Sequence, residues 1–283
     1  MSAWPATSDW IRAAALALPM MATPWPALTQ VPPNPQIEIA YVEPARPDYR
    51  PIFERLKQRQ VLEELRQFLS PLLLTRKVLV KIDQCGGVRS PYKPGGPVVI
   101  CYEYIAKIES LAPAEKTADG VSRANAISGA FAQAVLHEVA HALFDVLKVP
   151  VFGREDDAAD KLAAFIMLQF GKDTAVRALR GSAWFFEASN RTWTGSDFSD
   201  ASGPETQRYY NYLCMALGGD RETFTPILRD TLLKTGRAVW CAKEYSDLRF
   251  AFNKTIMPHV DPDLLKTVQS VEWLKADDGA GIK

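Results

Sequence analysis

The stretch "AVLHEVAHALFDVL", residues 134–147, determines which fold and chemistry we expect of this chain. It places two of the three histidines, His137 and His141, four residues apart, with Glu138 directly after the first. Apolar residues surround them on nearly every side, which is typical of a buried helix. Because residues four apart lie on one face of a helix, about one turn or roughly 6 Å apart, both imidazoles can reach one metal ion.

Glu138 is rotated by about 100° from His137, so it would stand beside such an ion without binding it. A base that acts on water needs this position, and H-E-x-x-H is the zinc-peptidase motif for that reason. A catalytic zinc site has a third protein ligand and leaves its fourth position to water. The remaining histidine, His259, is a poor candidate because it follows a proline near the C-terminus and no second ligand accompanies it.

The acidic run "REDDAAD", residues 154–160, is the better source of a third ligand. Asp156 and Asp160 form a second pair four residues apart, so one carboxylate can bind the ion while the other holds a ligating imidazole. Only one of several neighbours can face the ion, and we predict Asp156, with Glu155 as the main alternative and Asp157 behind it. In the competing interpretation, these acidic residues merely favour the N-terminus of a helix.

The pattern along the chain predicts one mainly helical α+β domain, with a small β-sheet or hairpin before the zinc-binding helix. Ser122 is a good N-cap for that helix, which should run to about Leu147. Further helices are expected near residues 52–69, 155–170, 205–217, 222–235 and 243–257, and strands at 37–42, 78–83 and 98–104.

Four cysteines, none in a C-x-x-C pair, favour two disulfides over a metal cluster. A hairpin between the strands at 78–83 and 98–104 would bring Cys85 to Cys101. Cys214 and Cys241 would then pair by elimination. The alternative is four buried free thiols in a cytosolic protein.

The N-terminal run "IRAAALALPMMATPWPALTQ", residues 11–30, is short, apolar and ends in small residues and prolines, which is typical of a secretory signal. It could instead be a mobile apolar leader. We therefore expect an exported protein, periplasmic or extracellular, with no stable membrane span in the mature chain. The expected organisation is a signal peptide at 1–29, a linker at 30–36, a single domain at 37–275 and a flexible tail at 276–283.

The overall charge favours no particular partner. Lys plus Arg equals Asp plus Glu at 33 each, so no overall field favours nucleic acid.

Taken together, "HEVAH" and the later "GREDDAADKLAAFIML" resemble the H-E-x-x-H … E-x-x-A-D arrangement of gluzincin-type zinc metallopeptidases. More narrowly, the chain resembles an uncharacterised bacterial family described as metallopeptidases. In that family a "CYE" strand precedes the zinc helix, a "GRE-D-AAD" helix follows it, and an "RYYNYLC"-like segment comes later. The resemblance covers residues 37–260, and it implies a zincin-like domain that binds Zn²⁺ and acts on a peptide or protein substrate.

Carried over residue by residue, the resemblance makes His137 and His141 zinc ligands and Glu138 the catalytic base. Asp156 matches the family's ligand glutamate, and Asp160 matches the aspartate that orients a ligand histidine. Asp156 is one methylene shorter than glutamate, so its helix must lie closer to the ion.

The expected function is therefore a zinc-dependent metallopeptidase that hydrolyses peptide bonds through a zinc-activated water, with Glu138 as general base. Arg208 and Tyr209 are candidates for stabilising the oxyanion, although that segment could equally be a helix with aromatic core residues. The edge of the strand at 98–104 could hold an extended substrate. Two rival hypotheses stay open: a non-catalytic zincin-scaffold binding or structural module in the cell envelope, and a metal-free helical protein with a chance motif.

Overall fold

The computed structural model describes residues 31–88, 91–189, 201–228 and 234–274. The expected signal peptide at 1–29 and tail at 276–283 lie outside the described residues. Within the expected linker, Asn34 is fully buried and its Nδ2 donates to the backbone oxygens of Leu69 at 2.7 Å and Leu72 at 2.9 Å. These hydrogen bonds attach the start of the described chain to the segment that follows the first two helices.

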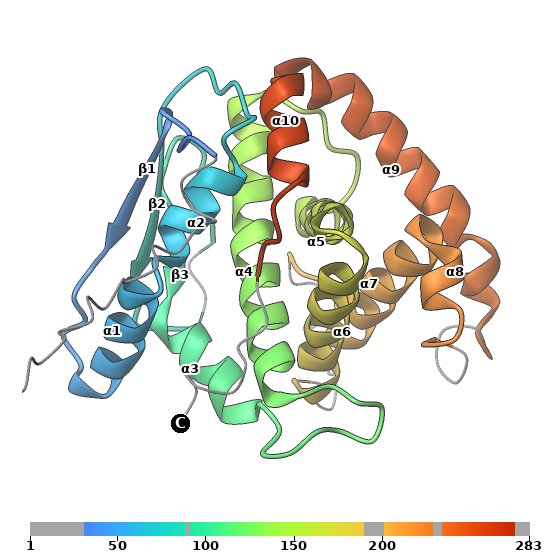
Figure 1. Ribbon diagram of the computed structural model, residues 1–283, viewed down its shortest axis with the longest axis horizontal. Coiled ribbons are helices and arrows are strands. Elements are labelled where there is room, and N and C mark those ends of the chain that lie inside the picture. The colour runs from blue at the N-terminus through green and yellow to red at the C-terminus, as the bar shows by residue number, and fades with distance from the viewer. Residues whose placement is uncertain (1–30, 89–90, 190–200, 229–233, 275–283) are drawn as a thin grey trace, which may run out of the picture.

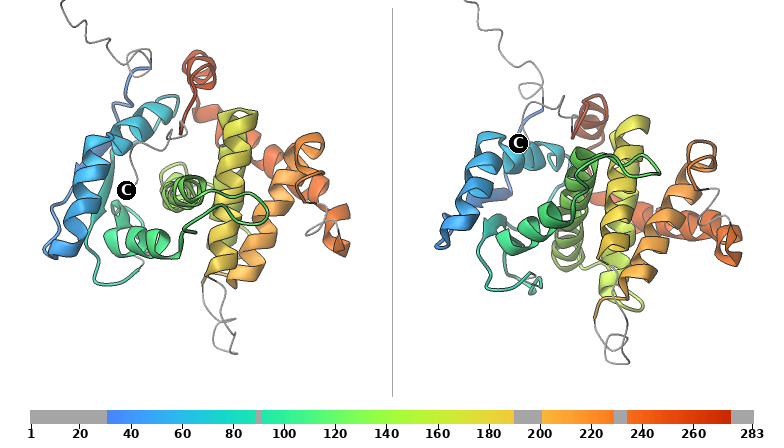
Figure 2. Two further views of the ribbon diagram at one scale, coloured as in Figure 1. Left: turned by 60° about the horizontal axis from the view of Figure 1, so that its bottom comes forward. Right: turned by 90° about the horizontal axis from the view of Figure 1, so that it is seen from below.

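A long helix, α4, runs through the centre of the molecule, with the sheet and α1–α3 on one side and α5–α7 on the other (Figure 1). The same division is visible along the axis of α4 in the left view of Figure 2. The elements in chain order are β1 (Ile37–Tyr41), α1 (Arg50–Gln58), α2 (Val61–Phe68), β2 (Val78–Asp83), β3 (Val98–Cys101), α3 (Tyr102–Leu111), α4 (Arg123–Val146), α5 (Glu155–Met167), α6 (Lys172–Ala188), α7 (Glu205–Gly219), α8 (Arg221–Phe224), α9 (Cys241–Thr255) and α10 (Pro262–Gln269).

Helices dominate and the sheet is small, in agreement with the predicted class. The sheet has the order β1-β2-β3, and all of its strands are parallel. The predicted hairpin is therefore wrong: Val80 pairs with Val98 in parallel register, after the chain has crossed back over residues 84–97. A parallel pair needs a crossover of a dozen or more residues, and this connection is long enough to provide one. The predicted strand at 98–104 ends at Cys101, because Tyr102 begins α3.

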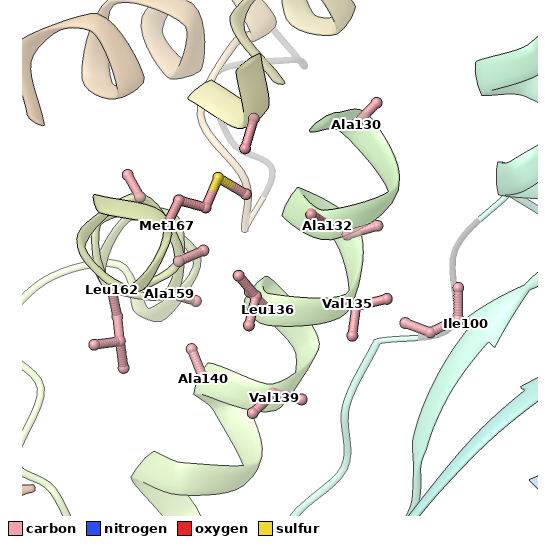
Figure 3. Close-up of a cluster of buried hydrophobic side chains, with 14 of the residues drawn as sticks. Ile100, Ala130, Ala132, Val135, Leu136, Val139, Ala140, Ala159, Leu162 and Met167 are labelled. Atoms are coloured by element: carbon pink, nitrogen blue, oxygen red, sulfur yellow. The ribbon is translucent and has the colours of Figure 1, made fainter. Parts of the chain in front are cut away.

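Both sides of α4 are buried, which explains why its sequence is apolar nearly all round. Figure 3 shows Val135 on the side that faces Ile100 of β3, whereas Leu136 and Ala140 lie on the side of Ala159 of α5. α4 therefore carries its two histidines between the sheet and the helical layer.

Local contacts and backbone conformation explain where α4 begins and ends. Ser122 Oγ accepts a hydrogen bond from the amide of Asn125 at 3.2 Å, as the N-cap prediction requires. At the other end, Lys148 adopts a positive φ of 54°, and the chain then turns through Pro150 into α5. α5 lies across α4 (Figure 1), and its first turn contacts the C-terminal half of the long helix at His137 and His141.

Other helix predictions need correction. The expected helix at 52–69 is two helices, α1 and α2, because Gln60 takes a left-handed conformation with φ 54°. The expected helix at 222–235 is described only as the short α8, and residues 229–233 of it lie outside the described residues. Helices α3, α6 and α10 were not predicted, whereas α7 and α9 lie close to the expected positions.

The two predicted disulfides are present, Cys85–Cys101 and Cys214–Cys241. Their existence is compatible with an exported protein. The first forms without a hairpin: Asp83 of β2 lies opposite Cys101, so the ends of two parallel strands bring Cys85 and Cys101 together. The second joins α7 to the start of α9.

None of the helices in the described part of the chain has the length and apolarity that a membrane span requires.

α4 and α6 cross in close contact at a pair of glycines. A Cβ on Gly181 would lie 2.0 Å from the backbone oxygen of Asn125, and one on Gly129 would lie 2.5 Å from that of Ala178. Ser182 Oγ also donates to the backbone oxygen of Gly129 at 2.9 Å. The two helices can approach this closely only because neither carries a side chain at the crossing.

Gly181→Ala is expected to lower the free energy of unfolding by about 1–3 kcal/mol, because the added methyl forces the helices apart. In an unconstrained helix the same change would stabilise by about 1 kcal/mol, so the sign is diagnostic. Urea denaturation measures it. The control is Gly87→Ala, where an added Cβ meets nothing within 4 Å and no decrease is expected. An unchanged or increased stability of Gly181→Ala would contradict the described crossing.

Candidate metal centre

Three donor atoms converge where α5 meets α4. His141 Nε2 lies 3.0 Å from Asp156 Oδ1 and 3.3 Å from His137 Nε2, and His137 Nε2 lies 3.6 Å from the same carboxylate oxygen. Both histidines are buried, with exposed fractions of 7% and 9%. Donors placed tetrahedrally at about 2.0–2.1 Å from one zinc ion would stand about 3.3 Å from one another. The three separations therefore fit a zinc ion.

The other ring nitrogen of each histidine is held by a carboxylate. His137 Nδ1 lies 2.8 Å from Asp160 Oδ1, and His141 Nδ1 lies 2.6 Å from Glu155 Oε1. Such partners keep the proton on Nδ1 and leave the Nε2 lone pair available for a metal. Glu155, the alternative ligand, thus stands on the Nδ1 side of the ring, while Asp156 stands on the Nε2 side.

Beneath this layer lies a fully buried ion pair between α5 and α7. Arg208 donates from Nε to Asp160 Oδ2 at 2.6 Å and from Nη2 to Oδ1 at 2.8 Å. Burial alone would raise the pKa of Asp160, but the Arg208 guanidinium and the His137 ring hold it well below its ordinary value. Gln133 Nε2 adds a hydrogen bond of 3.3 Å to the same carboxylate. Asp160 therefore lies between the Arg208 guanidinium and the His137 ring and contacts both.

The two candidate oxyanion residues lie in different surroundings. Arg208 is 2% exposed and engages Asp160 through two of its nitrogens, although it also lines the cavity at the centre. Tyr209 is partly buried, contacts the ring of Tyr210 at a centroid distance of 5.1 Å, and is not among the residues that line the cavity. Arg208 is thus connected to the three donors through Asp160, which holds His137 Nδ1.

A cavity of about 480 Å³ opens over the three donors. Glu138 lines it beside the histidines, on the same helix but outside the donor group. The opposite wall comes from β3, from the start of α3 and from the crossover segment. The residues of that wall are Val88, Pro91, Tyr92, Val99, Ile100, Cys101 and Tyr104.

Two residues at the centre were missed by sequence reasoning. Gln133 lies one turn before His137 on the same face of α4, so the spacing 133, 137, 141 could have revealed it. Ser202 donates from Oγ to Asp156 Oδ2 at 2.5 Å. It lies 46 residues away in sequence, and no local pattern marks it.

The histidines carry raised pKa values in the metal-free protein. Burial lowers the pKa of His141, but hydrogen bonds with Asp156 and Glu155 outweigh it and raise the pKa to about 9. The same competition leaves the pKa of His137 above its ordinary value, through Asp160 and Asp156. The His141 ring is thus protonated at neutral pH in the metal-free protein, and a metal bound through its Nε2 must displace that proton.

Affinity for a metal ion bound through His141 is accordingly expected to fall by about tenfold per pH unit as the pH drops below about 9, because binding displaces the proton of that ring. Protonated His141 also stabilises the folded metal-free protein. This contribution to the free energy of unfolding is complete below pH 6.5 and is lost as the pH rises through about 9. Competition titrations with a chelator of known proton affinity between pH 6.5 and 9 measure the first effect. An affinity that does not change over this range would contradict it.

Residues 41–256 match the model of the DUF4344 family, whose description reads "Putative metallopeptidase". No curated protein and no solved structure shows significant similarity to the chain. The matched segment contains His137, His141, Asp156, Glu138 and Asp160. Because it spans well over half of the sequence, the chain belongs to this metallopeptidase family.

Proposed function

We propose that the chain is a zinc-dependent peptidase with a zincin-like active site. The observation that carries the proposal is the convergence of His137 Nε2, His141 Nε2 and Asp156 Oδ1 at separations of 3.0–3.6 Å. Two imidazoles and a carboxylate form a typical donor set of catalytic zinc, and three protein ligands leave a fourth position open. The cavity over the donors gives that position room.

Zinc bound by these residues would supply Lewis acidity toward water and toward the carbonyl of the scissile bond. Glu138 has the role of general base: its carboxylate takes the proton of the attacking water and passes it to the leaving amine. Its proximity to His141 supports this role, since the Glu138 charge helps to raise the pKa of that ring. Asp160 and Glu155 hold the histidine rings in the orientation that metal binding needs.

The proposed substrate is a peptide in an extended conformation. β3 is an edge strand of the described sheet, and residues 99–101 line the cavity. An extended peptide could add to such an edge through main-chain hydrogen bonds, which would place a peptide bond near the donors. With two disulfides present, a periplasmic or extracellular location is part of the proposal.

The test is hydrolysis of a broad peptide library by the full chain, read by mass spectrometry. Cleavage is expected with zinc-loaded protein, should stop after chelation and should return with added zinc. Cleavage that persists after complete removal of metal would contradict the proposal. Stoichiometric zinc without any cleavage would instead favour the non-catalytic binding or structural module.

A further inference from the structure

The two carboxylate oxygens of Asp156 face different partners. Oδ1 faces the histidines, whereas Oδ2 accepts a hydrogen bond from Ser202 Oγ at 2.5 Å. Ser202 is 9% exposed and precedes α7 by three residues. A single hydroxyl therefore occupies the oxygen that does not face the metal position.

The backbone amides in the first turn of α5 are donors that could compete for the Asp156 carboxylate. Asp156 is the second residue of α5, and the N-cap residue Arg154 makes no side-chain capping bond. The first-turn amides of such a helix lack intrahelical partners and attract a carboxylate. In this structure the two carboxylate oxygens of Asp156 instead face the histidines and Ser202.

The same short segment also contacts a second carboxylate of α5, that of Asp160. Six residues after Ser202, Arg208 binds Asp160, which in turn holds Nδ1 of His137. Residues 202–208 thus contact both acidic positions, Asp156 through a hydroxyl and Asp160 through a guanidinium. The start of α7 and the residues just before it therefore contact α5 at the place where α5 meets α4.

We propose that Ser202 is a positioning residue of the metal centre, which fixes Asp156 for binding through Oδ1 alone and compensates for its shorter side chain. This inference rests on the proposed metal site. Partners of this kind contribute about 10–100-fold to metal affinity in proteins. Ser202 touches neither substrate nor reacting atoms in this role, so its effect should appear in binding of the metal itself.

The test compares Ser202→Thr with Ser202→Val, which have the same shape and differ in the hydroxyl. Zinc affinity of the full chain is measured by competition with a chelator. The valine variant should bind zinc about 10–100-fold more weakly than the threonine variant. The control is Ser182→Ala: this fully buried serine hydrogen-bonds backbone oxygens between α4 and α6, and its loss should leave zinc affinity unchanged.

Equal affinities of the threonine and valine variants, with the unsubstituted protein binding zinc, would overturn the inference and leave the proposed function standing. A weakened affinity in Ser182→Ala equal to that in Ser202→Val would also overturn it, since any buried serine would then have the same effect. Absence of zinc binding by the unsubstituted protein would overturn the proposed function itself.

Discussion

Glu138→Gln is expected to lower the rate of peptide hydrolysis by about 10²–10⁴-fold while zinc remains bound. Glutamine has nearly the same shape, but its amide cannot accept the proton of the attacking water. The donor group of His137, His141 and Asp156 does not include Glu138, so the ligands are unchanged. Single-turnover hydrolysis of a cleaved library peptide and the zinc content of the same sample measure the two effects together.

The matched control is Glu187→Gln, an exposed glutamate on α6 outside the cavity, which should retain full activity. If Glu138→Gln turned over substrate as fast as the control, Glu138 would not be the base. If it lost zinc as well as activity, Glu138 would contribute to metal binding. The assignment of Glu138 as base and of the neighbouring histidines as ligands would then be wrong.

Asp160→Asn is expected to lower the free energy of unfolding of the metal-free protein by about 3–5 kcal/mol. The substitution keeps the shape of the side chain but leaves the Arg208 guanidinium buried without its counter-charge. Urea denaturation measures the loss. The double variant Asp160→Asn with Arg208→Met should recover part of it, because both buried charges are then removed.

An exposed ion pair provides the comparison. Lys243 and Asp247 are one turn apart on α9, and both side chains are about two-thirds exposed. Asp247→Asn should cost about 0.3–0.5 kcal/mol, since water replaces the lost contact. Equal losses at positions 160 and 247 would show that the Asp160–Arg208 pair is not buried as described.

Much of the centre could be predicted from the sequence because its spacing is local. His137, Glu138 and His141 follow from the geometry of one helix, and so does the pair of Asp156 and Asp160 on the next. The boundaries of α4 were also predictable, since Ser122 caps one end and the chain turns before Pro150 at the other.

The direction of the strands was not predictable in this way. Burial alternates along β2, where Val78, Val80 and Ile82 are buried and the residues between them are partly exposed. This alternation carries no information on whether the neighbouring strand is parallel or antiparallel. A correct disulfide, Cys85–Cys101, was inferred from a wrong hairpin, because either direction can bring these two positions together.

Contacts between residues far apart in the sequence were not predictable either. Ser202 and Arg208 reach α5 from a segment more than forty residues later, and only the packing of α7 on α5 brings them there. Asp160 was predictable as the partner of a ligand histidine, and the structure shows that this histidine is His137; the ion pair of Asp160 with Arg208 was not predictable. The side chain of Asp156 is shorter than that of the glutamate it matches, yet its Oδ1 lies 3.0 Å from His141 Nε2.

The zinc content of the purified full chain, measured by elemental analysis after incubation with zinc and removal of free metal, tests the central claim most directly. The unsubstituted protein and His259→Ala should each hold about one zinc per chain, and the double variant His137→Ala with His141→Ala should hold none. Zinc missing from the unsubstituted protein, or present in equal amount in the double variant, would contradict the account.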